Sequence, residues 1–184
     1  MAAIRLFVAL VPPATVRAEL AALATPLDGV RWVPGDNLHL TLRFIGDTEA
    51  DKQARIEDAL ARVHVEPFIL PVGGIGLFPT RGPAKVLWAG TANGHTRLYQ
   101  LRKQVDEALL SVDMMLDVHS FHPHFTLGRL GHEYDPRPLA KFLGRHAAFE
   151  GPPFRVGEFH LMSSELAPGR APTYRIARTF SLVK

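Results

Sequence analysis

The sequence predicts an α+β fold built from two lobes, each with a sheet and helices. Three observations lead to this prediction. Segments with the two-residue period of strands alternate with segments of helical period, which excludes an all-helical bundle. Several predicted strands follow one another through connections too short for parallel crossovers, so a purely parallel sheet is disfavoured. One tetrapeptide also occurs once in each half. With 184 residues, 47% of them hydrophobic, we expect a single bilobal domain over residues 1–184 with a sizeable core.

The first half shows the order strand, helix, strand, helix. Residues 4–11 alternate between apolar and other side chains and stop at two prolines, and apolar residues at helical spacing then predict a helix over 14–27. Residues 38–45 form the second predicted strand. An Asp-Thr pair after it can cap a helix over 50–63.

The second half continues with strands and helices around one irregular stretch. Residues 73–83 are rich in glycine and proline, which predicts a loop beside a site. The other predicted elements are strands 68–72 and 85–89, a helix 95–112, a strand 124–130, a helix 138–146, and strands 154–162 and 174–182 around a loop at 167–172.

Composition excludes several classes of protein. The absence of cysteine excludes a disulfide scaffold, a cysteine nucleophile and a thiolate zinc site. The longest apolar runs fall well below the roughly 18 residues that a membrane span needs, so no membrane segment is expected. The N-terminus is strand-like rather than a signal peptide, and a cytoplasmic location is expected. The net charge of +3, with scattered basic residues, supports nucleic-acid binding only weakly.

The tetrapeptide His-x-Thr-Leu carries the strongest signal. It occurs at residues 39–42 and again at residues 124–127, 85 positions later and near the middle of the other half. Two copies are expected in roughly one shuffled chain in 500 of this composition. The repeat therefore indicates two related halves.

The spacing within the tetrapeptide has a geometric meaning. Side chains two residues apart on a strand point to the same face, so His39 and Thr41 share one face, as do His124 and Thr126. The apolar residues between them point to the opposite face, where a core would lie. If the two halves pack about an approximate two-fold axis, two histidines and two threonines converge on one cleft.

Two imidazoles at one point suit general acid and base chemistry near neutral pH. Phosphodiester cleavage needs both, because the attacking oxygen loses a proton while the departing oxygen gains one. Threonine hydroxyls would donate hydrogen bonds to the non-bridging phosphate oxygens. This scheme requires neither a metal ion nor a cofactor. A single His-x-Thr on a strand is more often structural, and it is the duplication that favours the catalytic interpretation.

Two arginines follow the motifs. On a regular strand Arg43 shares the face of His39, whereas Arg129 faces away from His124 by the same parity. Both are candidates for binding phosphate or RNA, with Arg43 favoured, and a solvated or core-edge arginine is the alternative. Phe44 is predicted to belong to the core. Three aromatic residues could stack a nucleobase, although packing is the favoured role for each: Phe78, Trp88 and Tyr174.

Two other kinds of site are disfavoured. The histidines in residues 119–124 could in principle share a metal ion, but no carboxylate lies among them and His39 offers a better partner for His124. The glycines at 73–76 lack the Gly-Lys-Ser/Thr ending of a nucleotide-triphosphate loop.

At these motifs the sequence resembles the two-histidine (2H) phosphoesterase superfamily, and within it the RNA 2',3'-cyclic phosphodiesterases, the LigT/ThpR-like proteins also called 2'-5' RNA ligases. The resemblance covers nearly the whole chain, with matching segments at 31–34, 37–46, 76–79, 86–90, 123–129 and 161–166, together with Gly169 and Tyr174.

The resemblance implies a bilobal α+β fold and metal-independent opening of a 2',3'-cyclic phosphate to a 2'-phosphate. It implies that His124 is the general base on water and His39 the general acid to the 3' oxygen, with Thr41 and Thr126 binding phosphate. The motifs are symmetric, so the residues themselves do not decide which histidine is the base. The resemblance also implies a reversible 2'-5' RNA ligase activity.

The expected partner is RNA with a 2',3'-cyclic phosphate end, tRNA fragments included, acted on by a monomer without membrane association. Two other interpretations stay open. The same chemistry could act on small cyclic nucleotides, or the cleft could belong to a non-catalytic module that binds RNA ends.

Overall fold

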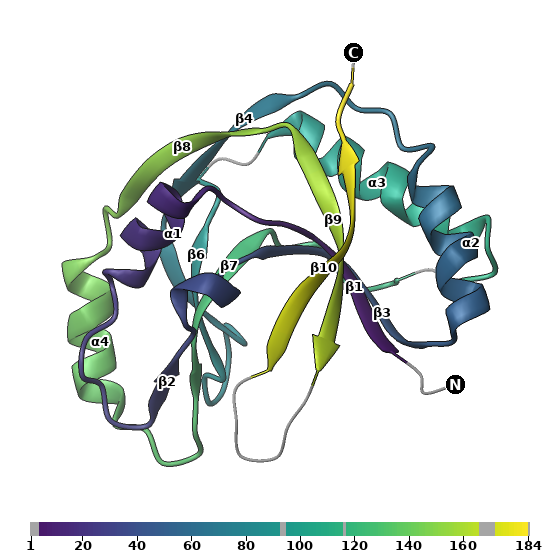
Figure 1. Ribbon diagram of the computed structural model, residues 1–184. Coiled ribbons are helices and arrows are strands. Elements are labelled where there is room, and N and C mark those ends of the chain that lie inside the picture. The colour runs from purple at the N-terminus through teal and green to yellow at the C-terminus, as the bar shows by residue number, and fades with distance from the viewer. Residues whose placement is uncertain (1–3, 93–94, 116, 166–171, 184) are drawn as a thin grey trace.

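The computed structural model describes residues 4–92, 95–115, 117–165 and 172–183, and it has two sheets and four α-helices in that part of the chain (Figure 1). The strands are β1 (Ile4–Leu10), β2 (Val30–Trp32), β3 (Leu40–Thr48), β4 (Phe68–Gly73), β5 (Ile75–Phe78), β6 (Val86–Gly90), β7 (His124–Leu130), β8 (Glu150–Val156), β9 (Glu158–Glu165) and β10 (Thr173–Ser181). The helices are α1 (Ala14–Ala21), α2 (Ala50–Leu60), α3 (Thr96–Leu110) and α4 (Pro136–Arg145), with a short 3-10 helix at Gly35–Asn37.

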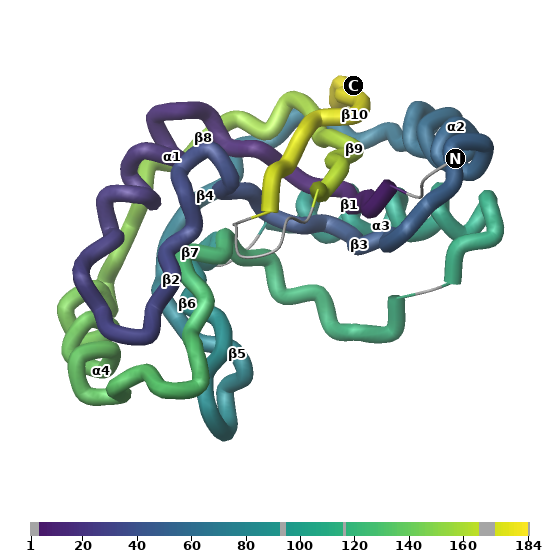
Figure 2. The backbone as a smooth tube through the Cα atoms, turned by 60° about the horizontal axis from the view of Figure 1, so that its bottom comes forward, coloured from purple at the N-terminus to yellow at the C-terminus, as the bar shows by residue number. Residues whose placement is uncertain are grey.

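The large sheet has eight strands. Seven of them lie in the order β10-β9-β1-β3-β7-β6-β5, and the eighth, β2, pairs with residues 128–130 of β7. Every paired strand in it is antiparallel. The small sheet joins β4 to β8. This is the α+β class that the sequence predicts, with β5 at the far edge of the sheet and projecting from the rest of the molecule (Figure 2).

The chain order strand, helix, strand, helix, strand occurs twice. It runs through β1, α1, β3, α2 and β4, and again through β6, α3, β7, α4 and β8. The two copies meet where β3 pairs with β7 through Leu40 and Phe125, which are 85 positions apart like the two tetrapeptides. Equivalent residues that face each other across an antiparallel pair mark a local two-fold axis. The two lobes are thus related as the repeat predicts.

The helices lie in pairs at the two ends of the molecule. Helices α1 and α4 lie on one side and α2 and α3 on the other (Figure 1). Buried apolar side chains from all four helices and both sheets form one continuous cluster, including Leu20, Leu60, Leu101 and Phe142. No helix in the described residues is both long and apolar enough to cross a membrane. The helices thus pack against the sheets through this shared core.

Several predicted boundaries differ from the structure. The first helix ends at Ala21 rather than at residue 27, because the residue before Pro26 is biased away from helical backbone. Residues 154–162 are not one strand: β8 ends at Val156, Gly157 follows, and β9 enters the other sheet. The short strand β2 was not expected. The predicted loop at 167–172 lies outside the described residues except for its last position.

The glycine- and proline-rich stretch 73–83 was predicted to be a loop, yet it contains β5. The reason lies in packing against β6. A Cβ atom on Gly76 would lie 2.2 Å from the ring of Trp88, so the strand needs glycine where the indole lies over it. Glycine here serves close approach rather than irregular backbone.

Candidate active site

Strands β3 and β7 bring the two tetrapeptides together at the centre of the large sheet. His39 lies just before β3, and His124 begins β7. Thr41 and Thr126 follow on the same face as their histidines, and all four side chains are half-buried. The intervening residues Leu40 and Phe125 are fully buried on the other face. The structure therefore places the two imidazoles and two hydroxyls where the motif spacing predicts.

Each histidine is held by the same backbone contact. Nδ1 of His39 lies 2.7 Å from the carbonyl oxygen of Asn37, and Nδ1 of His124 lies 2.6 Å from the carbonyl oxygen of His122. A carbonyl oxygen only accepts a hydrogen bond, so Nδ1 carries the proton in both rings. Each neutral imidazole then has Nε2 as its free proton acceptor. Both rings are thus oriented and in the same tautomer.

Burial lowers the pKa of both histidines below the ordinary value of 6.5. The hydrogen bond to the backbone opposes this change in each case. For His39, the positive charges of His124 and Arg129 lower the pKa further. For His124, the charges of His122 and Arg129 do the same. The two catalytic candidates are therefore within electrostatic reach of each other and of Arg129.

Aromatic side chains fix the planes of the two imidazoles. His39 contacts Phe7, with ring centroids 5.0 Å apart, and Tyr174, also at 5.0 Å and edge-on, and these two rings contact each other at 5.3 Å. Phe78 meets His124 edge-on at 5.0 Å. Tyr174 and Phe78, which the sequence offered as residues that could stack a base, thus pack directly against the histidines.

A β-bulge interrupts each motif strand just after its threonine. On β3, the residues on either side of Leu42 pair with two consecutive residues of β1, so Leu42 itself has no partner there. On β7, the residues on either side of Leu127 pair with two consecutive residues of β6, and Leu127 is left unpaired in the same way. The bulges fall at equivalent positions, 85 residues apart. An extra residue reverses the alternation of side chains beyond it. The parity argument for the arginines therefore fails in both halves.

Because of this reversal, residues after the bulge that were expected on one face of the sheet lie on the other. Arg43 turns to the core side and is only 7% exposed, whereas Phe44, predicted to be core, is 71% exposed. Arg129 occupies the position equivalent to Phe44, is exposed, and acts electrostatically on both histidines. The expectations that Arg43 shares the face of His39 and that Arg129 faces away from His124 are both wrong.

Arg43 belongs to a buried cluster of charges behind the sheet. Its Nη1 lies 3.1 Å from Asp117 and its Nε lies 3.6 Å from Asp106, and it also donates to the carbonyl of Met115. Arg102 binds the same two carboxylates. The predicted phosphate contact of Arg43 depended on the face of His39 and loses its geometric basis.

This charge cluster joins the two motifs. Arg102 on α3 donates to the carbonyl of Leu42 at the bulge of β3. It also binds Asp117 and lies over the ring of Phe121, at 5.2 Å from the centroid, in the connection that leads to β7. The connection before His124 is thereby tied to the strand that follows His39.

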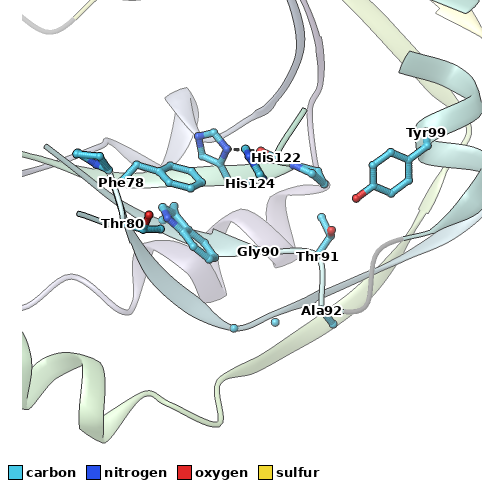
Figure 3. Close-up of a pocket in the computed structure, with 13 residues that line it drawn as sticks. Phe78, Thr80, Gly90, Thr91, Ala92, Tyr99, His122 and His124 are labelled. Carbon is cyan, nitrogen blue, oxygen red and sulfur yellow. Dashed lines mark hydrogen bonds between the residues drawn. The ribbon is translucent and has the colours of Figure 1, made fainter. Parts of the chain in front are cut away.

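A hollow of about 870 Å³ opens beside His124 (Figure 3). Its lining includes His124 but not His39. It is formed by Gly73, Gly74, Phe78, Pro79, Thr80, Trp88, Gly90, Thr91, Ala92, Tyr99, His122, Pro123 and His124. The surroundings of His124 and His39 therefore differ, although the two motifs are symmetric.

Two contributors were not predicted as site residues. Asn37 and His122 supply the carbonyl oxygens that orient the histidines, and they lie two positions before them in both halves. Asn37 also donates from its side chain to the carbonyl of Pro172, 2.9 Å away, just before the strand that carries Tyr174. The offset of 85 residues relates Asn37 to His122 and is the signal that could have found them.

The neighbouring histidines do not form a metal-binding group with His124 in the described residues. His119 is 88% exposed and bonds through Nδ1 to Asp117 at 2.8 Å. Within the described ranges, no group of three or more histidine, aspartate or glutamate side chains is arranged to hold a metal ion. His122 contributes its backbone carbonyl to His124 and its side chain to the lining of the hollow.

Comparisons with known proteins agree with this geometry. The family described as LigT like Phosphoesterase matches the chain twice, at residues 10–88 and 90–173. The chain is 32% identical over 179 residues to an RNA 2',3'-cyclic phosphodiesterase of Archaeoglobus fulgidus, covering 96% of this chain and 99% of that protein. It is 35% identical over 188 residues to the protein of that name from Thermus thermophilus, covering 97% and 90%. The crystal structure of E. coli LigT in its apo form superposes with a TM-score of 0.80 at 27% identity, over 100% of both chains.

Proposed function

The chain belongs to the LigT-like phosphoesterase family, and from that premise we propose that it is an RNA 2',3'-cyclic phosphodiesterase. It opens the cyclic phosphate at the end of an RNA and leaves a 2'-phosphate. The observation that carries the proposal is the pair of imidazoles with the same tautomer, each with Nε2 free, on one face of adjacent strands. Curated relatives with the name RNA 2',3'-cyclic phosphodiesterase support the substrate.

In the proposed reaction Nε2 of His124 takes a proton from water as the water oxygen attacks phosphorus. The bond from phosphorus to the 3' oxygen breaks, and that oxygen takes a proton from Nε2 of His39, which enters the step as the imidazolium, protonated at both ring nitrogens. One proton is thus removed and one delivered, and the 2' oxygen keeps the phosphate. The assignment of base and acid follows the family. With a 5'-hydroxyl in place of water as the attacking group, the same two transfers in the same direction form a 2'-5' linkage.

Positive charge and hydroxyl donors are available for the phosphate. Arg129 is the exposed cation that acts on both histidines, and Thr41 and Thr126 share their face. A guanidinium can donate two parallel hydrogen bonds to phosphate oxygens, which suits the negative charge held there during transfer. We assign phosphate binding to these three residues, and to Arg43 a structural role in the buried cluster.

The physiological setting is part of the proposal. We propose that the enzyme acts as a monomer in the cytoplasm on RNA ends with a cyclic phosphate, tRNA fragments among them. In support, E. coli LigT, similar in structure, has been crystallised with 3'-AMP and with phosphate. Neither a metal ion nor a cofactor enters the proposed reaction.

Substitution of the histidines separates an enzyme from a module that only binds RNA ends. We expect His39→Ala and His124→Ala each to lower kcat by about 10²- to 10⁴-fold, because each removes one proton transfer. Affinity for a 2'-phosphorylated product, measured by calorimetry, should change little in comparison. Wild-type protein that binds cyclic-phosphate RNA without turnover, and variants that change only its affinity, would support the binding module instead.

A further inference from the structure

The backbone carbonyls at the two β-bulges connect each motif strand to the segment that leads to the opposite histidine. In the first of these connections, the carbonyl of Leu127 on β7 accepts a hydrogen bond from the N–H of Val33, 2.8 Å away. Val33 directly follows β2 and lies in the segment that leads to His39. The strand that carries His124 thus holds the segment before His39 through a bond between backbone groups.

The second half makes the equivalent connection through a side chain. Val118 lies 85 positions after Val33, but it is 84% exposed. The described residues between α3 and β7, where Val118 lies, contain no strand equivalent to β2. The carbonyl of Leu42 at the bulge of β3 accepts a hydrogen bond from Nη1 of Arg102 instead. A guanidinium on α3 therefore takes the place that a backbone N–H has in the first half.

Arg102 also contacts the segment that leads to His124. Its Nη2 donates to Asp117, 3.1 Å away, and its guanidinium lies over the ring of Phe121, 5.2 Å from the centroid. Its Nε donates to Asp106 of the same helix at 2.7 Å. Each nitrogen of the guanidinium thus has a different partner, and the residue is only 8% exposed. Because the guanidinium is planar, these bonds fix it in one orientation.

The orientation of His124 depends on this segment. The carbonyl that accepts from Nδ1 of His124 belongs to His122, which directly follows Phe121 in the chain. A shift of the segment would therefore move both the carbonyl and the imidazole that it holds. A misplacement of about 1 Å in a reacting group can lower a rate by about 10²-fold. The contacts that hold the segment on β3 thus bear directly on the proton transfer.

We propose that Arg102 is a positioning residue, which aligns His124 with His39 by holding the segment before His124 on β3. The inference rests on the proposed function and assigns to Arg102 an effect on the rate that acts through the histidine. The first half needs no such side chain, because its backbone groups make the bond directly. Loss of Arg102 should therefore disturb His124 and leave the orientation of His39 unchanged.

Two carboxylates of the buried cluster provide a matched comparison. Asp106 and Asp117 each contact both arginines of the cluster, but Asp106 belongs to α3 and Asp117 to the segment before His124. Asp117→Asn should lower kcat for adenosine 2',3'-cyclic phosphate at least about tenfold and change KM little, because alignment rather than binding is lost. Asp106→Asn should keep kcat close to the wild-type value. Equal losses of kcat in the two variants would overturn the proposal.

Arg102→Lys provides a second variant that keeps the buried positive charge. Lysine has one nitrogen in place of three and cannot reproduce the separate bonds of the guanidinium. We expect kcat to fall at least about tenfold, and the double variant with Asp117→Asn to lose little more, because both changes break the same connection. Wild-type kcat in Arg102→Lys, or losses that multiply in the double variant, would contradict the proposal. Failure of the wild-type protein to hydrolyse this nucleotide and a cyclic-phosphate RNA would instead refute the proposed function.

A measurement without turnover reports on the imidazoles themselves. The Nδ1 proton of His124 is donated to a backbone carbonyl and is therefore protected from exchange with water. In protein with isotope-labelled histidine, we expect its NMR signal to broaden or disappear in Asp117→Asn and to remain in Asp106→Asn. The Nδ1 proton of His39 is held in the same way and should be unchanged in both variants. If Asp117→Asn keeps both signals or loses both, Arg102 does not position His124 selectively and the proposal is wrong.

Discussion

At the level of single residues, the proposed mechanism makes the Nε2 atoms of His39 and His124 determine how the rate depends on pH. The base must be neutral, so activity falls as pH drops through its pKa, and the acid must be protonated, so activity falls as pH rises through its pKa. Burial first, and nearby positive charge as well, lowers both pKa values below 6.5. We therefore expect a bell-shaped profile of kcat/KM with its maximum below pH 6.5. A flat profile between pH 5 and 9, with chemistry rate-limiting, would contradict the two-histidine mechanism.

Arg129 acts on the same profile in a way that a purely structural residue would not. Its charge lowers the pKa of both histidines, so Arg129→Gln should move both limbs of the profile to higher pH. The variant should also weaken binding of a 2'-phosphorylated product, because a phosphate contact is lost. Arg137→Gln is the matched control, since Arg137 pairs with Asp135 at the surface and should leave the profile unchanged. An unaltered profile in Arg129→Gln would remove Arg129 from the site.

At the level of elements, the bulges mark the limit of what the sequence could predict. The two His-x-Thr pairs were placed correctly because they precede the bulges, where alternation holds. The positions of Arg43, Phe44 and Arg129 were not, because one extra residue reverses the alternation of the side chains that follow it directly. The residues around Leu42 do not predict the bulge, because its unpaired position depends on how β3 pairs with the neighbouring strand β1. Tertiary pairing thus decided which arginine reaches the cleft.

The buried charge cluster should stabilise the connection between α3 and β7. Asp117→Asn removes a partner of both Arg43 and Arg102, and we expect it to lower the free energy of unfolding by about 2 kcal/mol or more. Asp113→Asn is the control, because it removes only an exposed pair with Arg55 and should cost less than about 1 kcal/mol. Urea unfolding of the three proteins measures both changes. Equal losses would mean that the buried cluster is no stronger than a surface pair.

At the level of the whole molecule, a fold repeated about a local two-fold axis has acquired two unlike ends. The repeat explains why the sequence reveals so much of the architecture, since one tetrapeptide identified both halves and the strands that join them. It could not reveal the hollow, which depends on β5 and on the approach of Trp88 to Gly76. The two motifs are symmetric, and the hollow beside His124 makes their surroundings unlike.

A cleft that binds RNA rather than a single nucleotide should respond to substrate length and to salt. We expect kcat/KM to rise from a cyclic mononucleotide to a short oligonucleotide with the same cyclic end, and the gain to shrink as salt increases, because added phosphates contact basic side chains. A length series at two salt concentrations measures this. A flat series would favour small cyclic nucleotides as the substrate.

The central claim is that two histidines open a cyclic phosphate toward the 2' position without a metal ion. The most direct measurement is hydrolysis of a short RNA with a 2',3'-cyclic phosphate end in excess EDTA, with the position of the product phosphate assigned by phosphorus NMR. We predict a 2'-phosphate from the wild-type protein and no detectable product from His39→Ala or His124→Ala over the same time. A 3'-phosphate, or activity that disappears with EDTA, would contradict the account.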